Sequence, residues 1–145
     1  MTIEQLSVFV ENKSGKLVQV LKTLGDAGID LRAMSIADTS DFGILRLIVD
    51  EPGRAHDILR AAGYVVILNN VLPLAIDDAP GSLAGVLGAL SEAAIGVEYV
   101  YAFVAHGGNR AHVILRTTDD KLAASVLKAR GVAFVPAGEI LRAPQ

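Results

Sequence analysis

The most constraining feature of this sequence is an internal repeat, in which the same pattern of apolar run, turn and helix occurs twice. Gly15 and Gly81 stand 66 positions apart, and each follows an apolar run that ends in acidic or amide residues. The match continues beyond each glycine at the same offset, in the pairs Leu17/Leu83, Leu21/Leu87, Leu24/Leu90, Ala27/Ala93, Ile29/Ile95 and Leu31/Val97. Since two copies are too few for a solenoid, the repeat predicts two small domains, at residues 1–69 and 70–145.

The amino-acid composition limits the partners that such a chain can have. Halves of about 70 residues bury little apolar surface alone. Because 52% of the residues are hydrophobic, we expect the halves to pack on each other or on a second copy in a homodimer. The formal net charge of −3 does not favour binding to nucleic acid or to an anionic membrane. The absence of cysteine excludes disulfides, and without a secretory signal pattern it is compatible with a cytoplasmic location.

Hydrophobic periodicity predicts the elements of the first half. Apolar residues from Leu17 to Leu24 recur at helical spacing, which indicates a helix that Ser14 caps and that ends at Gly25 or Gly28. A second helix begins with Asp50-Glu51-Pro52 and runs to residue 62, and the apolar runs between turns predict strands at residues 3–10, 29–38, 42–49 and 64–68. Asn69-Asn70 is then the whole linker to the second half.

The second half repeats this order. It predicts helices at residues 80–93 and 119–128, a hairpin turn at His106-Gly107-Gly108-Asn109, and strands at residues 71–76, 97–105, 111–116 and 132–135. Each half therefore has the order β-α-β-β-α-β. Because right-handed crossovers place both helices on one side, we expect an α+β, ferredoxin-like fold in which two helices cover one face of a four-stranded antiparallel sheet.

In this arrangement the second strand of each half lies at a sheet edge. The second-half strand, from Val97 to Val104, is long and aromatic, and an exposed edge of this kind favours aggregation. We therefore expect it to pair with the matching strand at residues 31–39. That pairing would place the domains side by side in one eight-stranded antiparallel sheet.

The loop Asp78-Ala79-Pro80-Gly81-Ser82-Leu83 and the helix that follows it resemble the ACT domain. The first half matches through Asn12-Lys13-Ser14-Gly15-Lys16-Leu17 and Ala27-Gly28-Ile29-Asp30. The resemblance covers nearly the whole chain as two tandem copies, with no catalytic domain attached. It implies a regulatory protein without a cofactor that binds a small molecule, usually an amino acid, where two domains meet, and that acts on a partner enzyme or transporter.

The family resemblance also implies where the ligand lies, namely between the first strand–helix loop of one domain and the helix–strand connection of the other. One site would join Asn12 and Gly15 to Ile95, Gly96 and Val97, and the other would join Asp78 and Gly81 to Ile29, Asp30 and Leu31. The residue types suit an amino acid, since N–H groups at a helix start attract a carboxylate. Asp78 or Asp30 can bind the ammonium group. We favour the second site because Gly96 replaces the polar residue that Asp30 supplies.

Simpler roles for the same residues leave two alternatives open. Asp77 and Asp78 can serve only as turn and cap residues, and Ser14 stands where the ACT motif has proline. These departures favour an alternative in which the protein has lost its ligand and regulates a partner by protein contacts alone. A small enzyme is the weaker alternative, since no nucleophile has an evident base and His56, His106 and His112 have no neighbours at metal-ligand spacing.

Overall fold

The computed structural model describes residues 2–38, 41–103 and 110–141. The chain forms two compact units. The first-half unit comprises residues 4–69 and the C-terminal residues from 140, and the second-half unit comprises residues 1–3 and 70–139. The expected turn at residues 106–109 lies outside the described residues, as do Thr39 and Ser40 between the strands expected at residues 29–38 and 42–49.

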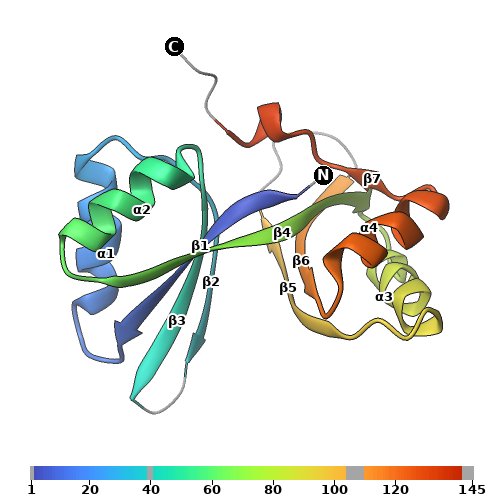
Figure 1. Ribbon diagram of the computed structural model, residues 1–145, viewed down its shortest axis with the longest axis horizontal. Coiled ribbons are helices and arrows are strands. Elements are labelled where there is room, and N and C mark those ends of the chain that lie inside the picture. Colours follow the sequence, from blue (N-terminus) through green and yellow to red (C-terminus); the bar gives the residue numbers. More distant parts are fainter. Residues whose placement is uncertain (1, 39–40, 104–109, 142–145) are drawn as a thin grey trace. The chain divides into compact units, whose positions relative to one another are not determined.

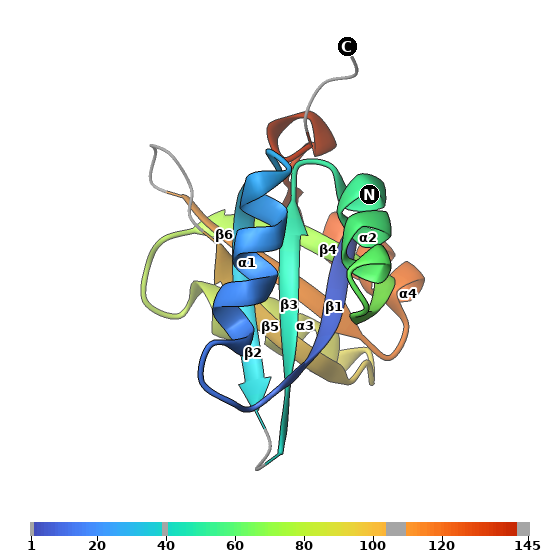
Figure 2. The same ribbon diagram turned by 90° about the vertical axis from the view of Figure 1, so that its left-hand side faces the viewer.

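The first-half unit is a sheet covered on one face by two helices (Figures 1 and 2). Its strands follow the order β2-β3-β1-β4. Figure 2 shows α1 and α2 side by side on the same face of this sheet. The elements are β1 (Ile3–Glu11), α1 (Lys16–Asp26), β2 (Leu31–Asp38), β3 (Phe42–Val49), α2 (Pro52–Ala61) and the first part of β4 (Val65–Asp77).

Alternation along the strands builds the core of this unit. Leu6 and Val8 of β1 lie directly opposite Leu47 and Leu45 of β3 in an antiparallel register, so these four side chains share the face under the helices. All four are buried, and α1 adds the buried Val20 and Leu24 to the same cluster. Burying each such side chain stabilises the fold by about 1.5–3 kcal/mol, which explains why the helix-facing positions are aliphatic.

The second-half unit has the same construction, with strand order β5-β6-β4 and the short β7 also paired to β4 (Figure 1). Its own core comprises buried residues that include Leu72, Leu90, Leu115 and Leu127. After the second part of β4, its elements are α3 (Ser82–Glu92), β5 (Val97–Phe103), β6 (Arg110–Thr117), α4 (Asp120–Ala129), β7 (Ala133–Phe134) and a 3-10 turn at Ala137–Glu139.

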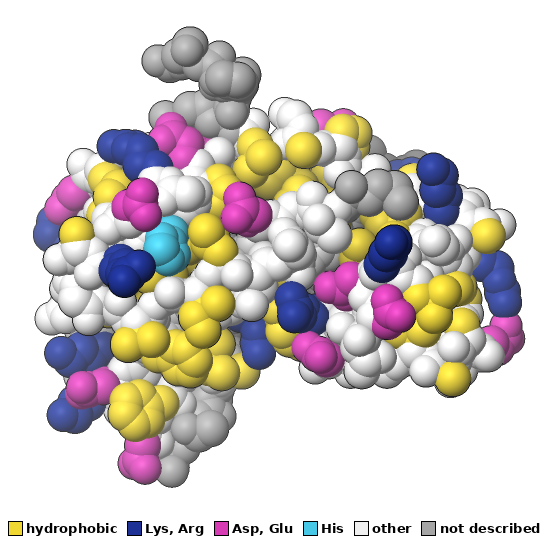
Figure 3. Space-filling view, viewed as in Figure 1, with side chains coloured by type: hydrophobic (Ala, Val, Ile, Leu, Met, Phe, Trp, Pro, Cys, Tyr) yellow, Lys and Arg dark blue, Asp and Glu magenta, His cyan; other side chains and the backbone are white. Residues whose placement is uncertain are grey.

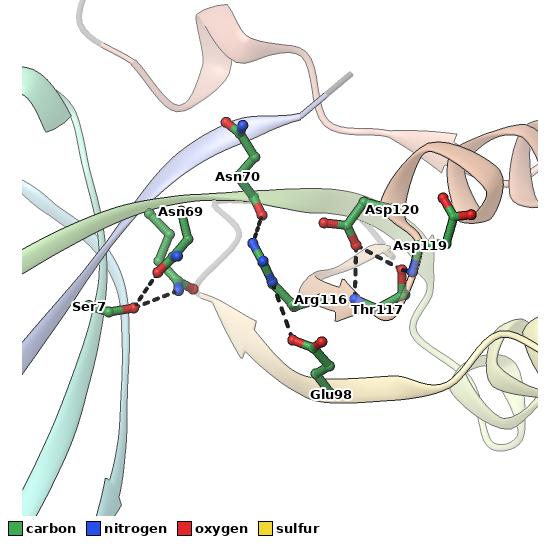
Figure 4. A network of polar contacts seen from close by, with 9 residues as sticks. Ser7, Asn69, Asn70, Glu98, Arg116, Thr117, Asp119 and Asp120 are labelled. Carbon is green, nitrogen blue, oxygen red and sulfur yellow. Dashed lines mark hydrogen bonds and ion pairs between the residues drawn. The ribbon is translucent and has the colours of Figure 1, made fainter.

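The prediction of a linker at Asn69-Asn70 is wrong, because both residues lie inside the 13-residue strand β4. Their polar groups have partners that make a strand favourable there (Figure 4). The Ser7 hydroxyl donates to Oδ1 of Asn69 at 2.7 Å, and Nη1 of Arg116 donates to the backbone carbonyl of Asn70 at 2.8 Å. A single strand thus serves as the fourth strand of one repeat and the first strand of the next.

The predicted eight-stranded sheet is wrong as well, although the α+β class and the antiparallel sheet with four helices are confirmed. The described residues form seven strands in the order β2-β3-β1-β4-β6-β5, with β7 beside β4. β2 and β5 stand at the two ends of this order, so they do not pair with each other as expected. The continuity of β4 accounts for the difference, since it joins the repeats without using either edge.

Apolar side chains remain at the surface, as the composition predicts. In the first-half unit, Phe9, Phe42, Val65 and Ile67 are all at least 40% exposed. Figure 3 shows hydrophobic side chains gathered on the visible face of this unit, over β1 and β3. Among the described residues, no helix is long and apolar enough to cross a membrane.

Candidate functional site

The two strand–helix loops of the repeat have the same backbone conformation at their glycines. Gly15 precedes α1 with φ 85° and ψ −12°, and Gly81 precedes α3 with φ 87° and ψ −11°. Only glycine adopts this left-handed conformation without strain. The predicted cap at Ser14 is therefore wrong, since Gly15 holds the cap position and no side chain caps either helix.

These helix starts are open to a ligand. A Cβ atom added at Gly15 or Gly81 would meet nothing within 4 Å, so the glycines are needed for their backbone angle and not because of crowding. The first turn of a helix carries N–H groups without intrahelical partners. The N–H of the first residue of each helix already bonds within its loop, Lys16 to the carbonyl of Lys13 and Ser82 to that of Ala79, both at 3.2 Å. With no side-chain cap on either helix, the next N–H groups of the first turn can donate to an approaching anion.

Asn12 and Asp78 occupy matching positions before the two glycines, and both are exposed. The backbone N–H of Asn12 donates to the carbonyl of Asp41 at 2.9 Å, which fixes the start of the first loop. Asp78 does not cap α3, so its simpler role as a cap is wrong. Its exposed carboxylate can therefore meet a ligand at the Gly81 loop.

The connection from the first helix to the second strand is fastened in both units by the same pair of contacts. In the first half, the N–H of Asp30 donates to the Asp50 carboxylate at 2.9 Å, and the N–H of Asp50 donates back to the carbonyl of Asp30 at 3.1 Å. In the second half, Gly96 donates to the Thr118 hydroxyl at 3.1 Å and accepts from the N–H of Thr118 at 2.9 Å. These hydrogen bonds fix the backbone at Asp30 and at Gly96, in the two helix–strand connections that the predicted sites use.

The residue before Thr118 anchors the same corner. The N–H and hydroxyl of Thr117 both donate to Oδ1 of Asp120 at 2.8 Å (Figure 4). Asp119 then caps α4 by accepting the N–H of Leu122 at 3.0 Å. Side-chain hydrogen bonds thus hold Thr118 against Gly96.

The Asp30 carboxylate already has a cationic neighbour that the sequence analysis missed. Nη1 of Arg32 lies 2.6 Å from Oδ2 of Asp30, and Nε of Arg32 donates to the backbone carbonyl of Ile140 at 3.0 Å. A ligand ammonium group at Asp30 would compete with this guanidinium. The sequence contains only a weak signal for this pair, since Asp30 precedes β2 and the strand register shifts between Leu31 and Ala33.

Two of the predicted site residues have side chains that a ligand cannot reach. Ile29 and Ile95 are both only 5% exposed and belong to the two cores, so they can offer a ligand only backbone groups. A Cβ atom at Gly96 would lie 3.1 Å from Cγ2 of Thr118, which explains the glycine at this position. Leu31 packs partly against the first core, whereas Val97 is 38% exposed.

Each half of the predicted site set lies within its own unit. Asn12, Gly15 and residues 29–31 belong to the first-half unit, whereas Asp78, Gly81 and residues 95–97 belong to the second. The pairing of one set with the other stays a prediction. Within the described ranges, no three His, Asp or Glu side chains are grouped so that they could hold a metal ion.

Comparison with known protein families identifies the family of this repeat. A family model described as "ACT domain pair" matches residues 1–142. The chain belongs to the ACT domain pair family. Members of this family are regulatory domains, and the resemblance carried by the two glycine loops is thereby confirmed.

Solved structures agree with this assignment. The ACT pair is 37% identical to protein BT0572 from Bacteroides thetaiotaomicron, with a TM-score of 0.90 over 99% of this chain and 98% of that one. The regulatory subunits of aspartate kinase from Thermus thermophilus and Thermus flavus share the fold at 18% and 17% identity. Their TM-scores are 0.67 and 0.59, over 88% and 87% of this chain and 90% and 88% of theirs. No curated protein matches the sequence.

Proposed function

We propose that this ACT pair is a regulatory protein that binds an amino acid at the loops before α1 and α3 and passes the bound state to a partner protein. The observation that carries the proposal is the pair of uncapped helix starts at Gly15 and Gly81, which share one backbone conformation and stand open to solvent. A carboxylate fits the N–H groups of the first turn that follow Lys16 and Ser82, whose own N–H groups bond within the loops.

The neighbouring side chains suit the rest of an amino acid. Asp78 is exposed beside the Gly81 loop and can bind an ammonium group by a charge-assisted hydrogen bond. Asp30 can do so only by sharing its carboxylate with Arg32. We therefore assign the stronger binding to a site built from Asp78 and Gly81 with residues 29–31, and the weaker to Asn12 and Gly15 with residues 95–97.

The fold that this chain shares with regulatory subunits of aspartate kinase supports a regulatory role. A ligand that binds one arrangement of the domains more tightly shifts the population toward it. A partner enzyme or transporter would then recognise the altered surface, by the reciprocal coupling that links two binding sites. A homodimer would supply further domain contacts through the exposed apolar side chains.

Thermal unfolding of the full chain with each standard amino acid at millimolar concentration tests the proposal. A ligand present at about 100 times its Kd stabilises the native state by about 2.7 kcal/mol, which raises Tm by several degrees in a chain of this size. Asp78→Ala should abolish that rise. Asp57→Ala, at an exposed carboxylate on α2, is the matched control and should keep it.

A second candidate function is regulation by protein contacts without any ligand. Two observations favour it: Arg32 already neutralises Asp30, and Thr118 leaves little room for a side chain at residue 96. This candidate predicts no rise in Tm with any amino acid, and it predicts a protein partner that binds equally well to the Asp78→Ala variant.

A further inference from the structure

A cavity of about 380 Å³, broadly open to solvent, lies within the second-half unit, beside the start of α3 and the end of β4. The turn from α4 to β7 closes one side of it. Its polar lining includes Asp77, Ser82, Arg110 and Arg130, and its apolar lining includes Val86 and Val132. The cavity thus combines two guanidinium groups, a hydroxyl and an aliphatic wall.

The first-half unit has a cavity of about 390 Å³ at the equivalent place in the repeat. Glu11 and Lys16 line it where Asp77 and Ser82 line the other. Because the hollow recurs at matching positions, it is a property of the fold, and the side chains decide what each copy binds. None of the residues predicted for the amino-acid site lines either cavity.

The two copies carry their basic side chains at different positions: the first has Lys16 where the second has Ser82, and two arginines line only the second. Arg110 lies opposite Asp77 in the β4–β6 register, just as Phe42 lies opposite Glu11 in the β1–β3 register. The second guanidinium belongs to Arg130, at the end of α4. Ala62, at the end of α2, holds the matching position in the first cavity. Arginine therefore replaces an apolar residue twice in the second cavity.

Both arginines are held at the cavity and keep donors for a ligand. Nη1 of Arg110 donates to the carbonyl of Ala75, a lining residue, at 3.0 Å. Nη2 of Arg130 pairs with the Glu92 carboxylate. A guanidinium carries five N–H donors, so one contact on each leaves a planar set of donors suited to a carboxylate.

We propose that the second-half cavity is a separate binding site for the carboxylate of a small aliphatic molecule. Arg110 and Arg130 donate to the carboxylate, the Ser82 hydroxyl adds a further donor, and Val86 and Val132 contact the aliphatic body. Two sources share this chemistry, namely an aliphatic amino acid, whose ammonium group would lie near Asp77, and the corresponding acid without nitrogen. The inference goes beyond the proposed function, because its main donors, Arg110 and Arg130, and its aliphatic wall lie outside the loops assigned there, although Ser82 begins the helix that follows the Gly81 loop.

The experiment follows the arginine Nε–Hε signals of the full chain by ¹H–¹⁵N NMR during titration with isovalerate and, separately, with valine. The signals of Arg110 and Arg130 should shift and saturate with at least one probe. Arg110→Gln and Arg130→Gln should each weaken binding about tenfold or more, since a charge-assisted hydrogen bond contributes at least that much. Arg60→Gln, which changes an exposed arginine on α2, is the matched control and should leave binding unchanged.

The two probes distinguish the two sources. Tighter binding of valine, with the advantage lost in Asp77→Asn, identifies an amino acid. Equal or tighter binding of isovalerate identifies the acid. If neither probe shifts the two arginine signals while circular dichroism shows a folded chain, the proposal is overturned.

The outcome is also separable from that of the proposed function. Asp30→Ala and Asp78→Ala remove the carboxylates of the loop site and should leave the arginine shifts intact. If these variants abolish the shifts, the arginine signals respond to a ligand bound at the loops and not in the cavity. The proposal of a separate site is then overturned.

Discussion

Gly28 and Ala94 occupy the same turn at the end of the first helix of each repeat, and both have a positive φ, of 76° and 59°. The surrounding hydrogen bonds match as well. The residue after each turn, Ile29 or Ile95, donates its N–H to a helix carbonyl, that of Leu24 at 3.0 Å or Leu90 at 2.9 Å. The second repeat therefore keeps the turn while placing a side chain in a conformation that favours glycine.

Ala94→Gly should stabilise the protein by up to about 1 kcal/mol, because it relieves the left-handed strain at the cost of some chain entropy. Gly28→Ala, the matched change in the first repeat, should destabilise it by a similar amount, and it introduces no clash since nothing lies within 4 Å of the added Cβ. Urea unfolding measures both. Equal stability of the parent chain and the two variants would show that neither residue is strained by a positive φ, contrary to this account.

The sequence predicts much of the fold because the repeat and the hydrophobic spacing are local signals. Leu17 to Leu24 place α1 correctly to within a few residues. Asn69 and Asn70 are misjudged because asparagine is depleted in strands, whereas their partners, Ser7 and Arg116, lie 62 and 46 positions away. The spacing of residues along the sequence cannot reveal partners at such separations.

The same distinction applies to the candidate site. The glycines at 15 and 81 were identifiable because a motif repeats around them. The contacts of Asp30 with Asp50 and Arg32 were not, since carboxylate partners follow from the folded backbone and not from spacing. Sequence alone predicts Ser14 as the cap because serine favours that position, whereas the left-handed angle at Gly15 moves the helix start by one residue.

The contact between Asp30 and Asp50 should matter more to stability than its counterpart in the second half. Asp50 is 2% exposed, so Asp50→Ala removes a buried carboxylate acceptor from the Asp30 N–H and should cost about 1–3 kcal/mol. Thr118→Val removes the matching acceptor from Gly96, which is exposed, and water can replace it. Chemical denaturation should therefore show a smaller loss for Thr118→Val, and the reverse order would contradict the structure.

Position 96 should accept a side chain without loss of stability only when Thr118 lacks its methyl group. Gly96→Ala places a Cβ 3.1 Å from Cγ2 of Thr118 and should destabilise the protein. Thr118→Ser removes that methyl group and keeps the hydroxyl that accepts the Gly96 N–H. A double-mutant cycle by thermal unfolding should give a favourable coupling of about 0.5–1 kcal/mol. Purely additive effects would show that crowding does not keep residue 96 a glycine.

Arg32→Gln should change stability by less than about 1 kcal/mol, because its ion pair with Asp30 is exposed to solvent. The variant should strengthen the binding of an amino acid whose ammonium group uses Asp30, since it removes the competing cation. Calorimetric titration compares the two proteins. Weaker binding by the variant would mean that Arg32 itself contacts the ligand and that Asp30 does not bind the ammonium group.

The central claim is that the open helix starts at Gly15 and Gly81 bind the ligand. The most direct test follows the backbone amides of the full chain by ¹H–¹⁵N NMR while adding the amino acid that most raises Tm. Binding at the loops predicts saturable shifts for the amides of Gly81 and the first turn of α3, and weaker shifts for those of Gly15 and the first turn of α1. Saturable shifts elsewhere in the chain with none at these amides would contradict the account.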